Sequence, residues 1–342
     1  MNTTPLATRN TRALLRTPSS RLTGTFSILL LLFTSAPSGL ASEPIEVVGP
    51  ESGLVNPFGV AFNDQGEMLI AEYEGGRLWK YTDDEKLQRL AADTPFNGMH
   101  NLSRTRDGRI YISDTRANYI RMLNENTGKV TIVCGTGSSG YNGDEIPASQ
   151  AMLNDPISIS LSPDDKRLYI ADIRNRRVRY IDLESGLIHS LAGNGKTAAP
   201  EDGAIANQSP LLDPRGVAED SQGNVYILSR RGHALRVVRP NGRIYTIAGT
   251  GQPHPADGPA LQAGLKGPKH LCIDGHDRVI IADAENHLIK RYDPLAKTLT
   301  TILKQGPMDT PLNRPHGVWV TPDQTLWVCD SYNDRILKVE LD

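Results

Sequence analysis

The chain has 342 residues, of which 38% are hydrophobic and 22% are charged, a composition typical of a globular protein with a large apolar core. Its formal net charge is −2, and residues 1–41 hold four arginines and no acidic residue, so residues 42–342 carry 33 basic against 39 acidic side chains. This mildly acidic balance excludes the basic surface that nucleic-acid binding requires.

The N-terminal segment has the layout of a secretory signal peptide. Arginines between Arg9 and Arg21 precede the apolar run FSILLLLF at 26–33, and small residues ending at Ala41 follow. The apolar run is too short to span a bilayer as a folded anchor. We therefore predict a cleaved signal peptide over residues 1–41, an exported mature chain in the periplasm or outside the cell, and no membrane span after cleavage. An uncleaved anchor is the alternative.

The rest of the chain repeats one template six times. An apolar stretch, a polar turn and a second apolar stretch end at an acidic residue, or at Ser229 in the fourth repeat. A third stretch follows with the alternation of a half-buried strand, as in RVRYI at 177–181, and all repeats but the last add a fourth. The template segments are 56–72, 98–114, 155–172, 213–229, 267–283 and 314–330. This pattern predicts an all-β fold, a six-bladed β-propeller with four antiparallel strands per blade, as a single domain over residues 42–342.

The last repeat lacks an outer strand because the chain ends after RILKVELD. An unassigned strand-like piece, EPIEVVGP at 43–50, precedes the first repeat. We predict that a strand at about 44–49 joins the last blade and closes the ring. Closure would pair an edge that otherwise stays open, and it would anchor the N-terminus of the domain.

Glycine-rich connections link several repeats. Gly135, Gly137 and Gly140 follow an apolar run with the spacing of a dinucleotide-binding turn. However, related connections begin at Gly193 and Gly249, and strand-like rather than helical stretches follow them. A dinucleotide turn occurs once and opens a helix, so the pattern favours connections between blades.

Three segments resemble NHL-repeat propellers: LYIADIRNRRVRYID at 168–182, VIIADAENHLIKRYD at 279–293 and LWVCDSYNDRILKVE at 326–340. The resemblance covers about residues 44–342, and it implies a six-bladed propeller, as in bacterial secreted members. It does not imply an activity, because this fold carries many unrelated functions. More distantly, the chain is similar in fold to gluconolactonase-type and amidating-lyase propellers. The recurring Asp-x-x-Asn pieces are interpreted as turn architecture rather than a site.

Residues just before each inner strand should rim the central opening of one face, and here the chain stops being repetitive. Imidazoles and cations gathered at one opening indicate a site for an anionic or carbonyl-bearing ligand. Arg215 could clamp a carboxylate or phosphate with two parallel hydrogen bonds. The predicted ligand-binding residues are His100, Asn101, Arg215, Lys269, His270 and His316. Solvated polar residues that merely fill a channel mouth are the alternative.

Three histidines also suggest a divalent metal site, because a catalytic zinc ion has three protein ligands and one open position. The segment RPHGVWV resembles a histidine segment of the amidating-lyase propellers, although His270 is offset by one residue from His316. Gluconolactonase-type propellers use a glutamate, an asparagine and an aspartate instead, and here Ile157, Ser158 and NPFGV replace two of these ligands. We therefore assign no metal ligands and no cofactor, and a divalent metal stays an alternative.

Other catalytic chemistry has no support in the sequence. No G-x-S-x-G motif occurs. Cys134, Cys272 and Cys329 form an odd and widely spaced set, which does not describe a disulfide scaffold. No catalytic residue is therefore assigned, and whether the chain is an enzyme stays open.

The leading hypothesis is an exported, monomeric propeller that binds a small molecule, glycan or peptide at the central mouth. A metal-dependent lyase or hydrolase at the same mouth is the first alternative. The second is a protein-interaction scaffold that uses the long connections at 134–155, 192–213 and 248–267.

Overall fold

The computed structural model describes residues 40, 42–82, 84 and 86–342. Apart from Leu40, the predicted signal peptide lies outside the described residues, so its cleavage and the export that it implies stay predictions. Among the described residues, no helix has the length and apolar character that crossing a bilayer demands.

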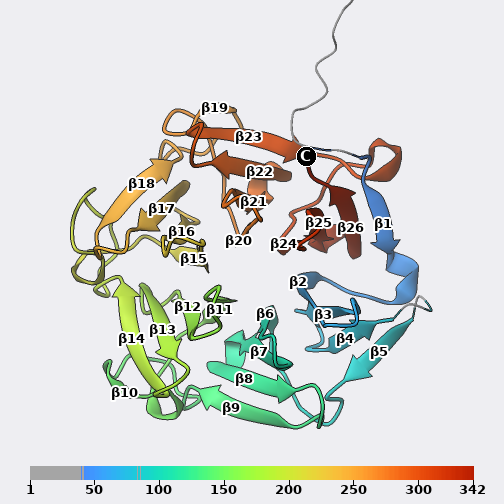
Figure 1. Ribbon diagram of the computed structural model, residues 1–342, viewed down its shortest axis with the longest axis horizontal. Helices are drawn as coiled ribbons and strands as arrows, with labels where there is room; N and C mark the ends of the chain where they lie inside the picture. Colours follow the sequence, from blue (N-terminus) through green and yellow to red (C-terminus); the bar gives the residue numbers. More distant parts are fainter. Residues whose placement is uncertain (1–39, 41, 83, 85) are drawn as a thin grey trace, which may run out of the picture. The chain divides into compact units, whose positions relative to one another are not determined.

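Six antiparallel sheets surround one axis (Figure 1). The first sheet contains β2 (Pro57–Phe62), β3 (Met68–Glu72), β4 (Leu78–Tyr81) and β5 (Leu87–Leu90). The second contains β6 (Met99–Arg104), β7 (Arg109–Asp114), β8 (Tyr119–Asn124) and β9 (Val130–Cys134). The third contains β11 (Pro156–Leu161), β12 (Arg167–Asp172), β13 (Arg177–Asp182) and β14 (Leu187–Ala192).

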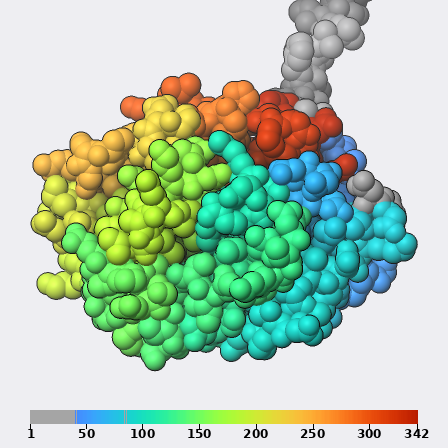
Figure 2. Space-filling view, turned by 60° about the horizontal axis from the view of Figure 1, so that its bottom comes forward, coloured from blue at the N-terminus to red at the C-terminus, as the bar shows by residue number. Residues whose placement is uncertain are grey.

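The other three sheets follow the same plan. The fourth contains β15 (Pro214–Glu219), β16 (Val225–Ser229), β17 (Ala234–Val238) and β18 (Ile244–Ala248). The fifth contains β20 (His270–Ile273), β21 (Val279–Asp283), β22 (Leu288–Asp293) and β23 (Thr298–Leu303). The sixth contains β24 (Val318–Val320), β25 (Thr325–Asp330), β26 (Arg335–Glu340) and β1 (Ile45–Val48). The predicted six-bladed propeller with four strands per blade is confirmed. Space-filling sectors follow one another around the ring in chain order (Figure 2).

The N-terminal strand closes the ring, as predicted. β1 pairs with β26 in antiparallel register, with Ile45 opposite Lys338 and Val48 opposite Ile336. The sixth sheet is also tied to the first, because Ser331 Oγ donates to Pro57 O at 2.6 Å. Segments far apart in sequence therefore share one sheet, and β26 is not left as an open edge.

Two connections each add a short fifth strand that the sequence pattern does not reveal. β10 (Ile146–Pro147) pairs with β14, and β19 (Gly258–Pro259) pairs with β23. The leading glycines of these connections have positive φ, 102° at Gly135 and 89° at Gly249. A Cβ at Gly135 would lie 2.2 Å from the carbonyl oxygen of Asn118. The glycines are therefore required by a close backbone approach, not by a phosphate.

The third strands of the third and fifth sheets bury a cation that their alternation would place in solvent. Neither Arg179 in β13 nor Lys290 in β22 has any exposed surface. Apolar side chains of neighbouring sheets pack between the blades, so both faces of a sheet are covered. Within 177–181, Arg177 and Tyr180 stay partly exposed, and Arg179 departs from the expected alternation because its side chain is fully buried.

These buried cations anchor the long connections. Arg179 donates to the carbonyl oxygen of Gly143 at 2.5 Å and to Asp144 at 3.0 Å. Lys290 Nζ donates to the carbonyl oxygen of Pro255 at 2.7 Å. The connections are thus held against the sheets that follow them, which disfavours mobile loops as a scaffold surface.

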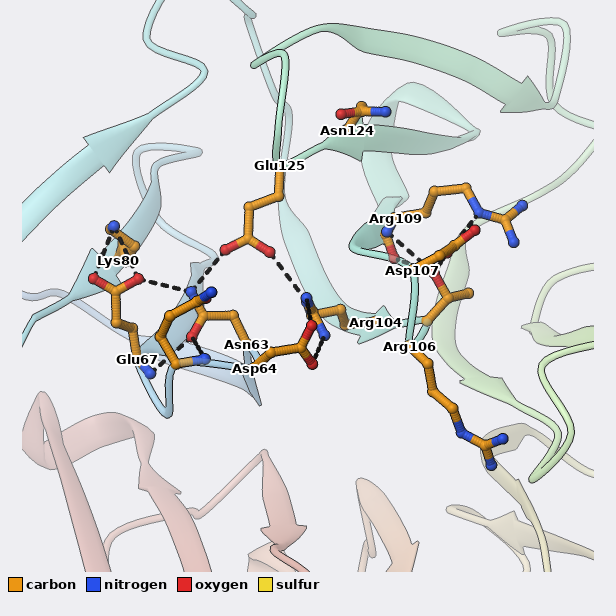
Figure 3. Close-up of polar contacts among 12 residues, drawn as sticks. Asn63, Asp64, Glu67, Lys80, Arg104, Arg106, Asp107, Arg109, Asn124 and Glu125 are labelled. Carbon is orange, nitrogen blue, oxygen red and sulfur yellow. Dashed lines mark hydrogen bonds and ion pairs between the residues drawn. The ribbon is translucent and has the colours of Figure 1, made fainter.

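The turns at the other end of the inner strands also link neighbouring sheets. Figure 3 shows Arg104, which donates to both carboxylate oxygens of Asp64 at 2.9 and 3.1 Å and to Glu125 at 3.1 Å. Asn63 Nδ2 donates to Glu125 at 2.7 Å. This network joins the first sheet to the second, away from the end of the strands where the predicted site lies.

Candidate functional site

The six predicted site residues all line one pocket at the hub. Each lies in or just before an inner strand, and Phe58, Ile157 and Ser158 complete the lining. The space among them is small, about 10 Å³, which is room for about one water molecule. The structure therefore brings the predicted residues together, whereas their binding of a ligand stays a prediction.

His100 and His316 are oriented by hydrogen bonds on their Nδ1 atoms. His316 Nδ1 lies 2.9 Å from the carbonyl oxygen of Arg314, which can only accept, so this nitrogen carries the proton. His100 Nδ1 lies 3.0 Å from Thr115 Oγ1, whose own proton goes to the carbonyl oxygen of Pro156. In both rings the proton on Nδ1 leaves Nε2 with a lone pair.

Both of these histidines are neutral at pH 7. Burial lowers the pKa of His100 well below its ordinary value, and the charge of Arg215 lowers it further. Burial does the same to the pKa of His316, with added repulsion from Lys269 and Arg215. Two uncharged hydrogen-bond acceptors therefore stand beside two cations.

Asn101 and His270 meet across the axis and form the floor of the pocket. Asn101 Oδ1 accepts the Ile159 N–H at 3.2 Å, and Asn101 Nδ2 lies 3.0 Å from His270 Nε2. His270 Nδ1 faces the Val318 N–H at 3.3 Å. Burial lowers the pKa of His270 to about 4, so its ring is neutral at pH 7. Its Nδ1 accepts the Val318 N–H, so the proton of the neutral ring lies on Nε2, which faces the side chain of Asn101. Both nitrogens are thus in contact with the protein, which favours a structural role for this residue.

A second cavity lies beyond this floor. It measures about 170 Å³ and is enclosed by inner strands, with Ser103, Cys272 and Trp319 in its wall. Asn101 and His270 line both cavities. Their contact therefore separates the mouth from the inner channel.

Arg215 and Lys269 are the cations of the pocket. Arg215 Nε is buried without a hydrogen-bond partner among the described residues, and Arg215 forms no ion pair with them. Burial lowers the pKa of Arg215 to about 10, with repulsion from Arg230 adding to the effect. Ser158 Oγ, which is also buried in the lining, likewise finds no partner in the described chain. Such orphaned groups are costly unless a ligand satisfies them.

Lys269 has only one acidic neighbour within ion-pairing distance among the described residues. Its Nζ lies 3.6 Å from Glu285, which also pairs with Arg230 at 2.9 Å and Arg314 at 3.9 Å. Burial lowers the pKa of Lys269 to about 7, and the charges of Arg215 and Arg230 contribute. One carboxylate thus serves three cations, which leaves an excess of positive charge at the mouth. The sequence pattern did not reveal Glu285, which occupies a variable turn position.

Stacked rings form the opposite wall. Phe58 stacks on His316 with ring centroids 3.9 Å apart and on Tyr73 at 4.6 Å. Arg116 lies over the Tyr73 ring, with its Cζ 4.6 Å from the centroid. Phe58 and His316 lie in the register that the repeat pattern identifies, whereas Tyr73 and Arg116 come from the turns after the second strands, whose residue types vary between blades. The stack holds His316 flat and limits its rotation.

The charge of Lys269 predicts a pH dependence. In the unfolded chain the lysine has an ordinary pKa of about 10.4, whereas burial lowers it to about 7 in the fold. Between these values the unfolded chain binds more protons, so the free energy of unfolding of the unliganded protein should rise with pH. Binding of an anion should weaken over the same range, because Lys269 loses its charge.

Urea unfolding and calorimetry at pH 6 to 10 would measure both trends, with Lys269→Met as the matched control. The difference in stability between the original chain and the variant should change in favour of the original chain as pH rises. A constant difference across that range would contradict a buried, destabilised ammonium group at this position.

The donor set of the mouth does not suit a divalent cation. No group of three or more His, Cys, Asp or Glu side chains with metal-site geometry occurs among the described residues. The lining instead places Arg215 and Lys269 beside His100 and His316, and cations repel a metal ion. The metal that gluconolactonase-type propellers hold therefore has no matching ligands here.

Comparison with family models decides the family. Residues 40–257 match the model described as SMP-30/Gluconolactonase/LRE-like region, and residues 312–339 match the NHL repeat. The chain belongs to the SMP-30/Gluconolactonase/LRE-like family. The resemblance to NHL-repeat propellers is confirmed as well. This member of the SMP-30/Gluconolactonase/LRE-like family departs from the expected metal ligands while it keeps the propeller.

Individual relatives agree on the fold. Protein SUPPRESSOR OF QUENCHING 1, chloroplastic, of Arabidopsis thaliana is 28% identical over 191 residues, which are 48% of this chain and 18% of that protein. The chain thus spans about a fifth of the length of this relative. An auxiliary nutrient binding protein from Bacteroides ovatus superposes with a TM-score of 0.66 at 12% identity, covering 90% of this chain and 78% of that one. Virginiamycin B lyase from Staphylococcus aureus with quinupristin gives 0.59 at 15% identity, covering 88% and 99%.

Proposed function

We propose that the chain is an exported binding protein that holds a small anionic ligand at the central mouth. The observation that carries this proposal is Arg215, whose Nε is buried without a hydrogen-bond partner in the described chain and which forms no ion pair there, although it lies beside Lys269. A carboxylate or phosphate would supply the missing acceptor, because a guanidinium binds both in a bidentate manner.

The remaining lining defines what such a ligand would need. The Nε2 lone pairs of His100 and His316 accept hydrogen bonds, so a hydroxyl or amide next to the anionic group fits them. Phe58 is stacked between His316 and Tyr73, so its ring faces are covered and only its edge can border a ligand. The pocket is too small to enclose a whole ligand. An anionic end group of a small molecule, glycan or peptide therefore enters the mouth while the rest stays outside.

A structural neighbour and the donor set of the mouth support a binding role. The auxiliary nutrient binding protein of Bacteroides ovatus carries a binding role in its name and shares this fold. The gluconolactonase-type and amidating-lyase-type reactions depend on a metal, and the mouth lacks a suitable donor set among the described residues. The export and monomeric state predicted from the sequence complete the proposal.

Thermal unfolding with a panel of ligands tests it. Short carboxylates, sugar phosphates, acidic sugars and acidic peptides are compared with their neutral amides or alcohols at low salt. An anionic ligand at 100 times its Kd should raise Tm by about 4 °C, while its neutral counterpart should have no effect.

Two results would overturn the proposal. One is a panel in which no anion raises Tm above its neutral counterpart. The other is a stoichiometric transition metal in the purified protein that is lost when His100 or His316 is replaced by alanine, which would favour the enzyme.

A further inference from the structure

The second strand of each sheet ends at a residue that is called the closing residue here, and in five of the six sheets this residue is acidic. The acidic closing residues accept similar hydrogen bonds in each of these sheets. In the sixth sheet, Asp330 accepts the Asn313 N–H at 2.7 Å and Arg335 Nε at 2.8 Å. In the second, Asp114 accepts the Asn97 N–H and Arg121 Nε, both at 2.6 Å. One carboxylate thus satisfies a backbone N–H of the preceding connection and a cation of the third strand.

The three other sheets with an acidic closing residue also have a backbone N–H donor and a cation. Glu72, Asp172 and Asp283 accept backbone N–H groups at 3.1, 2.8 and 2.7 Å. Arg77 pairs with Glu72, and Arg179 pairs with both Asp172 and Asp144 of the connection. Lys290 of the fifth sheet pairs with Asp257 of the connection. Five of the six sheets therefore neutralise the cation within the chain.

The fourth sheet lacks the carboxylate but keeps the donors. Ser229 stands at the closing position, and its hydroxyl donates to the carbonyl oxygen of Leu212 at 2.6 Å. The Leu212 N–H has no hydrogen-bond partner among the described residues. Arg236 is 4% exposed, and its Nε and Nη1 are buried with no partner in the described chain. The donors that a carboxylate would satisfy are therefore left without an acceptor.

The connection does not compensate for the missing charge. Asp202 occupies the place of Asp144 and Asp257, which pair with the cations of the third and fifth sheets. However, Asp202 Oδ1 accepts the Thr246 N–H at 2.7 Å, and it forms no ion pair with Arg236 within the described part of the chain. Burial lowers the pKa of Arg236, and the distant charge of Asp202 opposes this only in part.

The substitutions in this repeat also remove side-chain volume. Serine replaces the acid, and Gly232 replaces the asparagine found at Asn175, Asn286 and Asn333, each of which donates to its aspartate at 2.7 Å. A Cβ on Gly232 would lie 3.0 Å from Ser229 Oγ and 3.5 Å from Arg236 Nη1. The three groups therefore border one small place inside the fourth sheet.

We propose that a small monovalent anion, the size of chloride or formate, occupies this place and substitutes for the missing carboxylate. It accepts hydrogen bonds from Arg236 Nε and Nη1 and from the Leu212 N–H. Monovalent charge matches the single cation of this place. The anion stabilises the turn that carries Arg230, so the fourth sheet is completed by a bound ion where the others use the chain itself.

Crystals soaked in sodium bromide test the site directly, because bromide scatters anomalously. The expected result is an anomalous peak within hydrogen-bonding distance of Arg236 Nε and the Leu212 N–H. The peak should persist in Arg215→Met, which removes the cation of the mouth, and should vanish in Ser229→Asp, which restores the carboxylate. A fourth sheet without a peak, with Asp202 bonded to Arg236 instead, would overturn the proposal.

Thermal unfolding gives a second readout in solution. At constant ionic strength, exchange of sodium gluconate for 0.5 M sodium chloride or formate should raise Tm by about 2–4 °C. Ser229→Asp should have a higher Tm in gluconate and no response to chloride. Arg236→Met provides the same loss of response without a new charge, in case the aspartate variant does not fold. An equal chloride response in both variants and the original chain would refute a site at this place.

Discussion

Replacing Arg215 with methionine is expected to weaken binding of an anionic ligand at least 100-fold while it makes the unliganded protein more stable by about 1–2 kcal/mol. Arg215 is half-buried at the hub, its Nε has no hydrogen-bond partner and its guanidinium no ion-pair partner in the described chain, and Lys269 repels it. Methionine keeps much of the volume and removes the charge. Calorimetry with the ligand identified by the panel and urea unfolding without it would measure the two effects.

Arg116→Met is the matched control for this prediction. Arg116 belongs to the same rim but lies over the Tyr73 ring rather than in the pocket lining. It should reduce affinity by less than about tenfold, through the loss of long-range attraction. If Arg215→Met destabilised the protein, the guanidinium would have partners within the chain that offset its burial. The proposal that it binds an anionic ligand would then be contradicted.

Replacing Asp330 with alanine is expected to lower the free energy of unfolding by about 3–5 kcal/mol. Asp330 has no exposed surface and accepts hydrogen bonds from the Asn313 N–H, Asn333 Nδ2 and Arg335 Nε. Removal of the carboxylate leaves the buried Arg335 without this partner in the sheet that closes the ring. Urea unfolding followed by circular dichroism would measure the loss.

Ser229→Ala is the control at the corresponding position of the fourth sheet. It removes one hydrogen bond to the carbonyl oxygen of Leu212, so a loss of about 1 kcal/mol is expected. Equal losses at the two positions would show that the closing residue acts through packing alone and that its charge does not contribute to stability.

These two expectations describe different uses of charge in one fold. In five of the six blades, carboxylates neutralise the cations, and stability depends on the pairs. At the hub, Glu285 shares its charge among Lys269, Arg230 and Arg314, while Arg215 has no acidic partner among the described residues. The unpaired charge at the hub therefore lowers the stability of the unliganded protein, a cost that the proposed anionic ligand would offset.

Membership of the SMP-30/Gluconolactonase/LRE-like family thus does not extend to the chemistry of the mouth. Ile157, which lines it, offers no ligand atom, and the cations Arg215 and Lys269 oppose a metal ion there. A shared fold does not imply a shared site.

The sequence alone determined the number of blades, the strand order and the closure by IEVV at 45–48, because each depends on a pattern that recurs or on its single interruption. It also identified the register that carries His100, Arg215 and His316, since inner strands of similar length start at the same level around the axis. Only the tertiary structure decided which side chains are paired. Glu285 reaches Lys269 from a turn, and the buried side chain of Arg179 contacts a connection, so both pairings depend on contacts between segments that no local period encodes.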